Sequence, residues 1–261
     1  MSRIKKQFNL EGKVAIITGA SKGIGESIAR GLAEFGAKVV ISSRKQDAVD
    51  AVAADFQKAG FDAVGIACHV GHENQCQNLV QKTVDKYGRV DILVNNAATN
   101  PFYGALSKSQ GDLFDKVMNV NVKAPMILAN LCYPIMKKNG GGSVINIASV
   151  EGLKPSVGLG LYSISKSAII MLTKSQAKEW GRVGIRSNAI CPGLIQTKFS
   201  AALWKNEELL AAMEQNLPAG RMAQPDEMAG LAVYLASDAA GYTTGGVYTS
   251  DGGHMLAGDI I

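Results

Sequence analysis

Cysteine is scarce and widely spaced in this sequence. Its four cysteines, Cys68, Cys76, Cys132 and Cys191, form no C-x-x-C pair, and none lies at zinc-ligand spacing from a histidine. An isolated cysteine usually behaves as a small apolar side chain. We therefore expect reduced thiols in the core and no metal site.

Long apolar runs are also missing. No stretch approaches the roughly 20 apolar residues that a membrane-spanning helix needs, and the N-terminal MSRIKKQFNLEGK lacks the apolar middle of a secretory signal. The chain ends Gly258-Asp259-Ile260-Ile261, which does not resemble a Ser-Lys-Leu peroxisomal address. We expect a cytoplasmic protein with no membrane partner.

Charge of one sign is not concentrated anywhere. The net charge is +5, but the longest basic blocks are the pairs Lys5-Lys6 and Lys137-Lys138, too short for a nucleic-acid-binding patch. The 261 residues are 47% hydrophobic and 19% charged, without a linker or repeat. This composition indicates one large domain, 1–261, with no nucleic-acid partner.

Short apolar segments alternate with segments of helical periodicity. Because the apolar segments are apolar throughout, they indicate strands that are buried on both faces. The pattern predicts a doubly wound α/β fold with about seven parallel strands and helices on both faces, in which ligands bind at the carboxyl ends of the strands. The expected strands are 14–19, 38–43, 62–68, 90–96, 143–149, 185–191 and 245–250; the expected helices are 23–35, 45–59, 73–87, 110–137, 160–181 and 225–236.

A glycine-rich loop, TGASKGIG, follows the first expected strand. Glycines there allow a sharp turn, and the next helix offers free N–H groups to a pyrophosphate. The spacing G-x-x-x-G-x-G differs from the general G-x-G-x-x-G fingerprint, so a tight turn without a ligand is the alternative. The candidate dinucleotide-binding residues of this loop are Gly19, Ser21, Lys22, Gly23, Ile24 and Gly25.

The second expected strand ends in Ser42, Ser43 and Arg44, where an NAD-binding sheet usually carries an acidic residue. An arginine can bind a 2′-phosphate through paired hydrogen bonds, and Lys22 would add a second charge. This pattern predicts NADP(H) rather than NAD(H), with Ser43 and Arg44 as contacts. The alternative is that Arg44 is an ordinary solvated residue at a helix start.

Polar residues also stand at the ends of later strands. Ser149 ends the fifth, 13 residues before Tyr162 in YSISK, and Lys166 follows Tyr162 by one helical turn. With TGASKGIG, NNAA, INIAS, YSISK and CPGLIQT in this order, the sequence resembles the classical short-chain dehydrogenases/reductases over essentially its whole length. The resemblance implies a Rossmann fold and a single dinucleotide-binding catalytic domain.

The resemblance also implies the catalytic roles. Tyr162 matches the general acid/base, Lys166 its partner, and Ser149 the hydroxyl that polarises a carbonyl. Asn121 in MNVNVKAP matches the fourth member, with Asn119 as its competitor. A free phenol has a pKa near 10, and we expect the lysine cation, with the oxidised nicotinamide, to lower it.

Further cofactor contacts follow from the same resemblance. They are His69, Val70, Asn96, Ala97, Tyr162, Lys166, Pro192, Gly193, Ile195 and Thr197. Two positions depart from the family pattern: Ala98 replaces a usual glycine, and His69 replaces a usual aspartate at the adenine. The departure at His69 puts its adenine contact in doubt.

A substrate lid is implied around 194–217. The segment 199–217 has the pattern of an amphipathic helix, and its apolar side chains, with Phe102 and Tyr103, predict a hydrophobic carbonyl substrate. The alternative is that these side chains pack as core or between subunits. The apolar residues of the lid are Phe199, Leu203, Trp204, Leu209, Leu210, Met213 and Leu217.

Within the family, the sequence is most similar to NADPH-dependent carbonyl and retinal reductases. A 3-oxoacyl-[acyl-carrier-protein] reductase is the alternative, followed by gluconate-type sugar dehydrogenases. A non-catalytic NADP-binding sensor or scaffold is the alternative of another class. Family resemblance also implies a homotetramer assembled through 110–137, 160–181 and the C-terminal strand region.

Overall fold

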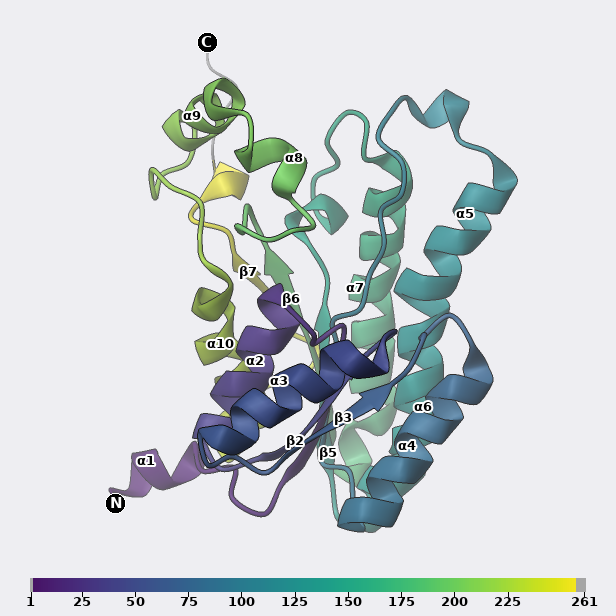
Figure 1. The fold of residues 1–261 in the computed structure, drawn as a ribbon, viewed down its shortest axis with the longest axis vertical. Helices are drawn as coiled ribbons and strands as arrows, with labels where there is room; N and C mark the ends of the chain where they lie inside the picture. Colours follow the sequence, from purple (N-terminus) through teal and green to yellow (C-terminus); the bar gives the residue numbers. More distant parts are fainter. Residues whose placement is uncertain (1, 257–261) are drawn as a thin grey trace.

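Seven parallel strands form one sheet (Figure 1). The computed structural model describes residues 2–256, apart from the side chains of Ala202 and Leu209, so Leu209 and the terminal residues 258–261 discussed above lie outside the described part. The strands are β1 (Val14–Thr18), β2 (Lys38–Ser43), β3 (Ala63–Ala67), β4 (Ile92–Asn95), β5 (Gly142–Ile147), β6 (Ile185–Pro192) and β7 (Val247–Ser250). Their order is β3-β2-β1-β4-β5-β6-β7. From β1 the chain adds β2 and β3 on one side and then β4 to β7 on the other, and sheets of this kind bind ligands at the point between β1 and β4 where the side changes.

Helices cover both faces of the sheet, which confirms the predicted fold class. Successive strand side chains alternate between two cores: Ile17 and Ile41 belong to one, and Ile16 and Val40 to the other. The helices α2 (Gly23–Glu34), α3 (Gln46–Lys58) and α10 (Ala229–Ala236) contribute to the first core; α4 (Glu73–Tyr87), α6 (Ala124–Lys138) and α7 (Gly160–Trp180) cover the other face. No helix among residues 2–256 is both long and apolar enough to cross a bilayer.

The helix expected over 110–137 is interrupted. Helix α5 (Gly111–Met118) passes into a π-helical turn, η2 (Asn119–Lys123), before α6 begins. Pro125 has no N–H to donate to the carbonyl of Asn121, four residues earlier, so one hydrogen bond of a regular α-helical ladder is missing where the π-helical turn stands. The expectation of one continuous helix is therefore wrong.

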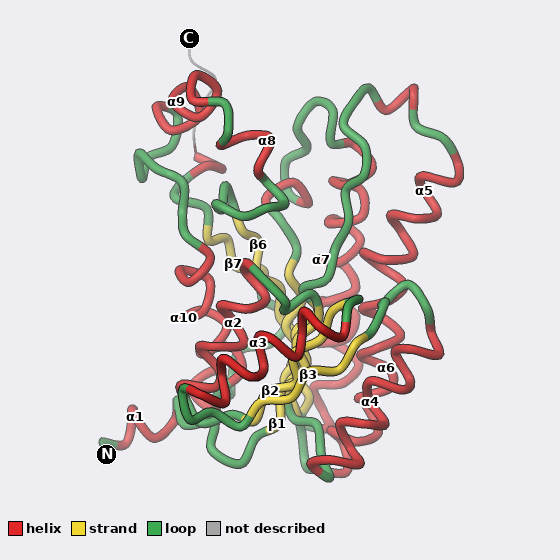
Figure 2. Tube along the Cα trace, viewed as in Figure 1, coloured by secondary structure: helices red, strands yellow, loops and turns green. Residues whose placement is uncertain are grey.

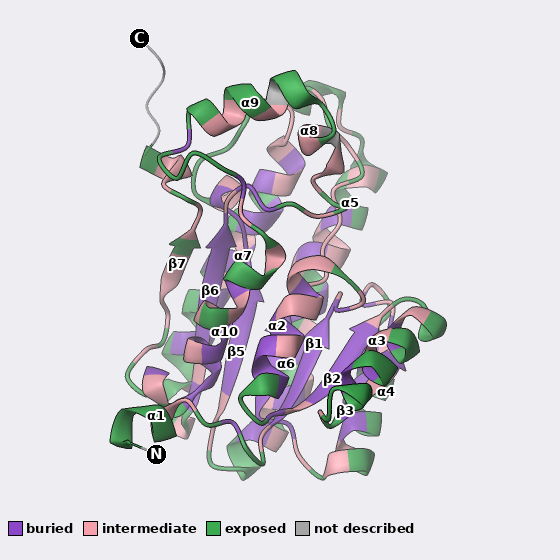
Figure 3. Ribbon diagram, turned by 60° about the vertical axis from the view of Figure 1, so that its left-hand side comes forward, coloured by how far each residue is buried: buried purple, intermediate pink, exposed green. Residues whose placement is uncertain are grey.

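The lid segment also differs from its prediction. Instead of one helix over 199–217, it forms α8 (Ala201–Trp204) and α9 (Glu207–Gln215). Asn206 followed by two glutamates is a helix-start signal that divides the apolar pattern. Both helices lie above the carboxyl ends of the strands, separated from the sheet by loops (Figure 2; the buried strands are purple in Figure 3).

The remaining helices are short. Helix α1 (Arg3–Gln7) was not expected from the sequence, and the helix expected over 225–236 begins with a 3-10 turn, η5 (Pro225–Met228). These elements are α1 (Arg3–Gln7), η1 (Leu106–Lys108), η3 (Val150–Gly152), η4 (Gly181–Val183), η5 (Pro225–Met228), η6 (Asp238–Ala240) and η7 (His254–Leu256).

Candidate active site

Ser149, Tyr162 and Lys166 meet at the carboxyl edge of the sheet. Ser149 lies just beyond β5, and α7 carries the other two residues one turn apart. Lys166 is 3% exposed; its Nζ donates a hydrogen bond of 2.7 Å to the carbonyl oxygen of Ile147 and lies 5.5 Å from the centroid of the Tyr162 ring. The lysine thus lies beneath the phenol and is tied to the strand that leads to the serine.

Burial dominates the electrostatics of this trio. Although Tyr162 is partly accessible, the surrounding protein desolvates its hydroxyl and raises the pKa of the phenol, while the hydrogen bond with Ser149 opposes the shift. Burial lowers the pKa of Lys166 to about 8. The phenol is therefore protonated at neutral pH in this structure, contrary to the lowered pKa expected from the sequence, because desolvation outweighs the favourable contacts.

Asn121 reaches the same site from the π-helical turn. Its Nδ2 donates to the carbonyl oxygen of Thr99 (2.9 Å) and to Oγ of Ser165 (3.0 Å), and its Oδ1 accepts from the N–H of Thr99 (2.8 Å). Asn119 points elsewhere, because its Nδ2 donates to the carbonyl of Gly71. Of the two candidates, only Asn121 contacts the helix of Tyr162 and Lys166.

The glycine loop opens α2 at the end of β1. Gly19 and Gly23 have φ angles of 65° and 62°, a region that favours glycine. A Cβ at Gly25 would lie 2.4 Å from Nδ2 of Asn96 and 2.6 Å from the carbonyl oxygen of Gly19. No side chain caps the start of α2 at Lys22, so the first N–H groups of this helix are free for an anionic ligand. The loop, including Ser21 and Ile24, therefore fits a dinucleotide pyrophosphate.

Thr18 and Asn96 brace this loop against β4. Oγ1 of Thr18 accepts hydrogen bonds from the N–H groups of Asn96 and Ala97, both 3.1 Å long. Nδ2 of Asn96 donates to the carbonyls of Thr18 (2.9 Å) and Gly19 (3.1 Å). The amide of Asn96 thus fixes the loop itself. Thr18 was missed by sequence reasoning, although its place at the end of β1 could have drawn attention to it.

The ends of β2 and β3 carry the residues expected around the adenosine. Arg44 is exposed and, among the described residues, makes no hydrogen bond or ion pair, so its guanidinium is available to a ligand. His69 accepts through Nδ1 from the N–H of Gly71 (3.1 Å), and its ring lies 4.6 Å from that of His72. Val70 is 9% exposed. Ser43 is half-buried beside Arg44.

The segment that follows Pro192, the last residue of β6, reaches the glycine loop at Thr197. Gly193 packs so closely on Asp251 that a Cβ would lie 2.7 Å from its Cα, and a Cβ at Gly23 would lie 3.4 Å from Cγ2 of Thr197. Ile195 forms an isolated parallel bridge with Ala223. These contacts bring the start of the lid against the turn expected to hold the cofactor.

Most apolar side chains of the lid pack on one another. Leu203, Trp204, Leu210, Met213 and Leu217 cluster with Leu194 and Met222, which is the core-packing alternative to a substrate lining. Trp204 also donates from Nε1 to the carbonyl of Thr197 (2.8 Å). Phe199 differs from this cluster: it is 58% exposed, and its ring centroid lies 5.9 Å from that of Tyr162. Phe199 is therefore the lid residue that faces the candidate chemistry.

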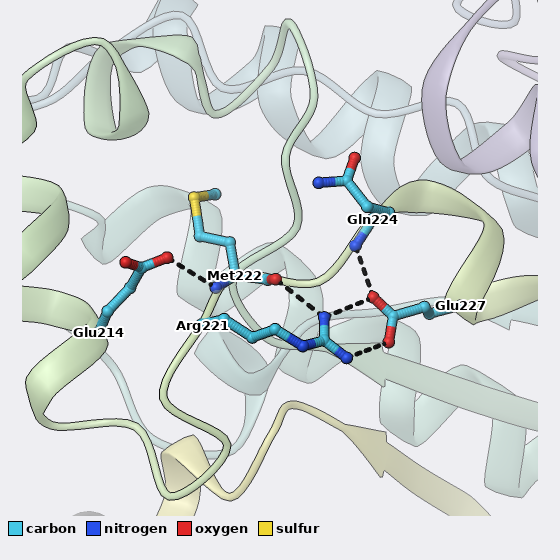
Figure 4. Close-up of polar contacts among 5 residues, drawn as sticks. All are labelled: Glu214, Arg221, Met222, Gln224 and Glu227. Atoms are coloured by element: carbon cyan, nitrogen blue, oxygen red, sulfur yellow. Dashed lines mark hydrogen bonds and ion pairs between the residues drawn. The ribbon is translucent and has the colours of Figure 1, made fainter.

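The far end of the lid is held by a polar clamp (Figure 4). Arg221 donates to both carboxylate oxygens of Glu227, at 2.8 and 2.7 Å, and to the carbonyl of Met222 at 3.1 Å. Glu227 also accepts from the N–H of Gln224, while Glu214 of α9 accepts from the N–H of Met222. The Arg221 guanidinium and the N–H of Gln224 hold the pKa of the Glu227 carboxyl at about 2. The clamp joins α9 to the start of η5.

This combination of a glycine loop, a Ser-Tyr-Lys trio and a bracing asparagine on a seven-stranded parallel sheet identifies the class of protein. The family described as enoyl-(acyl carrier protein) reductase, of the short-chain dehydrogenase type, matches residues 19–255. The chain belongs to the short-chain dehydrogenase/reductase family, which confirms the resemblance found in the sequence. It is therefore a dehydrogenase/reductase.

Individual relatives cover nearly the whole chain. Dehydrogenase/reductase SDR family member 4 of Oryctolagus cuniculus is 42% identical over 97% of this chain and 97% of its own length. The crystal structure of a gluconate 5-dehydrogenase from Burkholderia cenocepacia in complex with NADP and tartrate is 33% identical, with a TM-score of 0.93 over 97% of this chain and 99% of that one. A 7 alpha-hydroxysteroid dehydrogenase complexed with NADH and 7-oxo glycochenodeoxycholic acid is 34% identical, with a TM-score of 0.92 over 97% and 98%.

Proposed function

We propose that this protein is an NADP(H)-dependent carbonyl reductase that acts on apolar ketones or aldehydes and, in reverse, on secondary alcohols. The observation that carries the proposal is the Tyr162 phenol between Ser149 and the buried Lys166, whose Nζ lies 5.5 Å from the centroid of its ring. Similarity to a dehydrogenase/reductase SDR family member 4 supports the same reaction class.

Each residue of the trio has one task in the reductive direction. A bound reduced nicotinamide would supply the hydride to the carbonyl carbon. The Ser149 hydroxyl donates a hydrogen bond to the carbonyl oxygen, and Tyr162 gives that oxygen its proton. The Lys166 cation stabilises the phenolate that Tyr162 becomes. Asn121 holds α7 against the Thr99 segment through Ser165, so the trio keeps its geometry during proton transfer.

Arg44 supports NADP(H) as the cofactor. Its exposed guanidinium stands at the end of β2, where it is free to pair with a 2′-phosphate. The family architecture accommodates both cofactors, since NADP occupies the gluconate 5-dehydrogenase and NADH the 7 alpha-hydroxysteroid dehydrogenase. The preference of this chain therefore depends on its own residues around Arg44 and Lys22.

Two exposed aromatic side chains, Phe199 of the lid and Tyr103, support an apolar substrate. Phe199 faces the phenol, and Tyr103 is 75% exposed on the loop that lies against Gly158. A large ketone that covered these rings would remove apolar surface from water. A 3-oxoacyl thioester is the second candidate. The matched family is described as enoyl-(acyl carrier protein) reductase, which links it to carrier-bound acyl substrates, and the net charge of +5 suits an acidic carrier.

A substrate panel tests these assignments. NADPH and NADH oxidation by the purified protein would be followed with aromatic ketones, retinal, diketones, gluconate-type sugars and acetoacetyl thioesters. Rapid turnover of an apolar ketone with NADPH is expected. Turnover of the thioester alone would favour the second candidate, and cofactor binding without turnover of any substrate would favour a sensor or scaffold.

Exposed apolar side chains support a homotetramer. Phe114 of α5, Met126 of α6 and Met171 of α7 are 41%, 40% and 61% exposed, and burial of such side chains between subunits stabilises an assembly. Light scattering at working concentration is expected to give the mass of four chains; a monomer would contradict this proposal.

A further inference from the structure

Glu151 has an unusual set of contacts two residues beyond Ser149. One carboxylate oxygen accepts from Oγ of Ser156 (2.6 Å), and the other accepts from the N–H of Ser156 (2.9 Å) and from Oγ of Ser163 (2.9 Å). Ser163 follows Tyr162 directly on α7. The carboxylate thus joins the loop after β5 to the helix that carries the phenol.

The main chain of Glu151 reaches the serine itself. Its N–H donates to Oγ of Ser149 at 3.2 Å, which orients the oxygen that also interacts with the Tyr162 hydroxyl. Three protein hydrogen bonds hold the carboxylate in place. Its contacts are suited to holding two catalytic groups in register.

Few titratable groups of the described residues face the Tyr162 phenol. Lys166 lies below it on α7, Cys191 approaches from β6, and Glu151 approaches from the loop after β5, whereas Phe199 of the lid segment carries no charge. The negative charge of Glu151 raises the pKa of the phenol, in the same direction as burial. Glu151 thus opposes premature loss of the proton that Tyr162 donates.

We propose that Glu151 is a positioning residue for this reaction, tying the Ser149 segment to the first turns of the Tyr162 helix and keeping a negative charge beside the phenol. This inference rests on the proposed carbonyl reduction for its kinetic consequence, but the tie itself is a property of the chain. No relative or family description cited above assigns a role to this position.

Two substitutions separate the charge from the hydrogen bond. Glu151→Gln keeps an acceptor oxygen but removes the charge, so the phenol pKa falls and the pH profiles of both reduction and oxidation move to lower pH, by roughly half a unit or more. Ser163→Ala keeps the charge and removes one hydrogen bond. It is expected to lower kcat about 3-fold without moving the profile, and Val157→Ala, in the same exposed loop, should change neither.

Hydrogen–deuterium exchange tests the tie without relying on activity. Exchange of the segment 149–163 is expected to be faster in Glu151→Ala, which removes all three acceptor contacts, than in the wild type, and unchanged in Val157→Ala. Superimposable pH profiles for Glu151→Gln and the wild type, or unchanged exchange in this segment, would overturn the inference. A wild type inactive on every carbonyl would instead overturn the proposed function, and exchange alone would then decide whether Glu151 ties the two segments.

Discussion

The sheet edge and the lid build the two sides of this site in different ways. At the sheet edge, Thr18 ends β1, and the glycine loop and Ser149 come after β1 and β5, two central strands whose residues are almost all buried. In the lid, α8 and α9 pack mainly on their own small cluster. Chemistry and cofactor binding are therefore assigned to a rigid frame, and substrate selection to a segment that is packed separately from it.

This difference separates the expected effects of substitutions. Changes at the sheet edge should abolish turnover or switch the cofactor while leaving the substrate range intact. Changes at the exposed side of the lid should alter KM for the substrate and leave chemistry intact. A sheet-edge substitution that changed only the substrate KM, or a lid substitution that abolished turnover, would contradict this assignment.

Tyr162→Phe has the largest expected effect. Without the proton donor, kcat should fall by roughly 10²–10⁴-fold, whereas the Kd for NADPH should stay close to that of the wild type. Steady-state kinetics and fluorescence titration measure the two quantities. Tyr242→Phe, at a fully exposed tyrosine outside the site, is the control, and full activity of Tyr162→Phe would refute the mechanism.

Arg44→Asp should reverse the cofactor preference. Replacing the free guanidinium by a carboxylate repels a 2′-phosphate, so the NADPH/NADH ratio of kcat/KM is expected to fall by roughly 100-fold. The same charge change one residue later, in Lys45→Asp, should have a much smaller effect. An unchanged ratio in Arg44→Asp would remove the argument for NADP(H).

Lys166→Met should reveal the cost of burying a cation. The lysine pKa is about 8 when folded and 10.5 when unfolded, so the unfolded chain binds more protons between these values and wild-type stability gains from rising pH. Below pH 8 the variant should exceed the wild type by roughly 2 kcal/mol, a gain that disappears toward pH 10.5. Denaturant unfolding at several pH values measures it; a difference independent of pH would contradict the shift.

Phe199→Ala and Trp204→Ala distinguish the exposed side of the lid from its packed side. Phe199 faces Tyr162 from an exposed position, so its loss should raise KM for aromatic ketones about 10-fold without changing the melting temperature. Trp204 belongs to the cluster and supports Thr197, so its loss should weaken both cofactor and substrate binding. Identical effects of the two substitutions would show that the lid acts as one apolar surface.

The strands and the site residues at their ends were predictable because their signals are local. Apolar runs buried on both faces gave seven strands, and Ser149, Tyr162 and Lys166 follow from motifs at strand ends. The family pattern favoured Asn121 over Asn119, and the hydrogen bonds of Asn121 to Thr99 and Ser165, both distant in sequence, could not be read from that pattern. The interrupted helix was missed because hydrophobic periodicity continues through the π-helical turn, and the lid was misread because its apolar residues satisfy one another.

The number of residues in the π-helical turn, Asn119–Lys123, affects how the active site is built. Each residue rotates an α-helix by about 100°, so the wider turn at Asn119–Lys123 shifts the angular phase of everything before it relative to α6. Deleting one residue there would leave composition almost unchanged, yet it would swing the Asn121 amide away from Thr99 and Ser165. The number of residues in this turn, as well as their identity, therefore determines that the Asn121 side chain points to the active site.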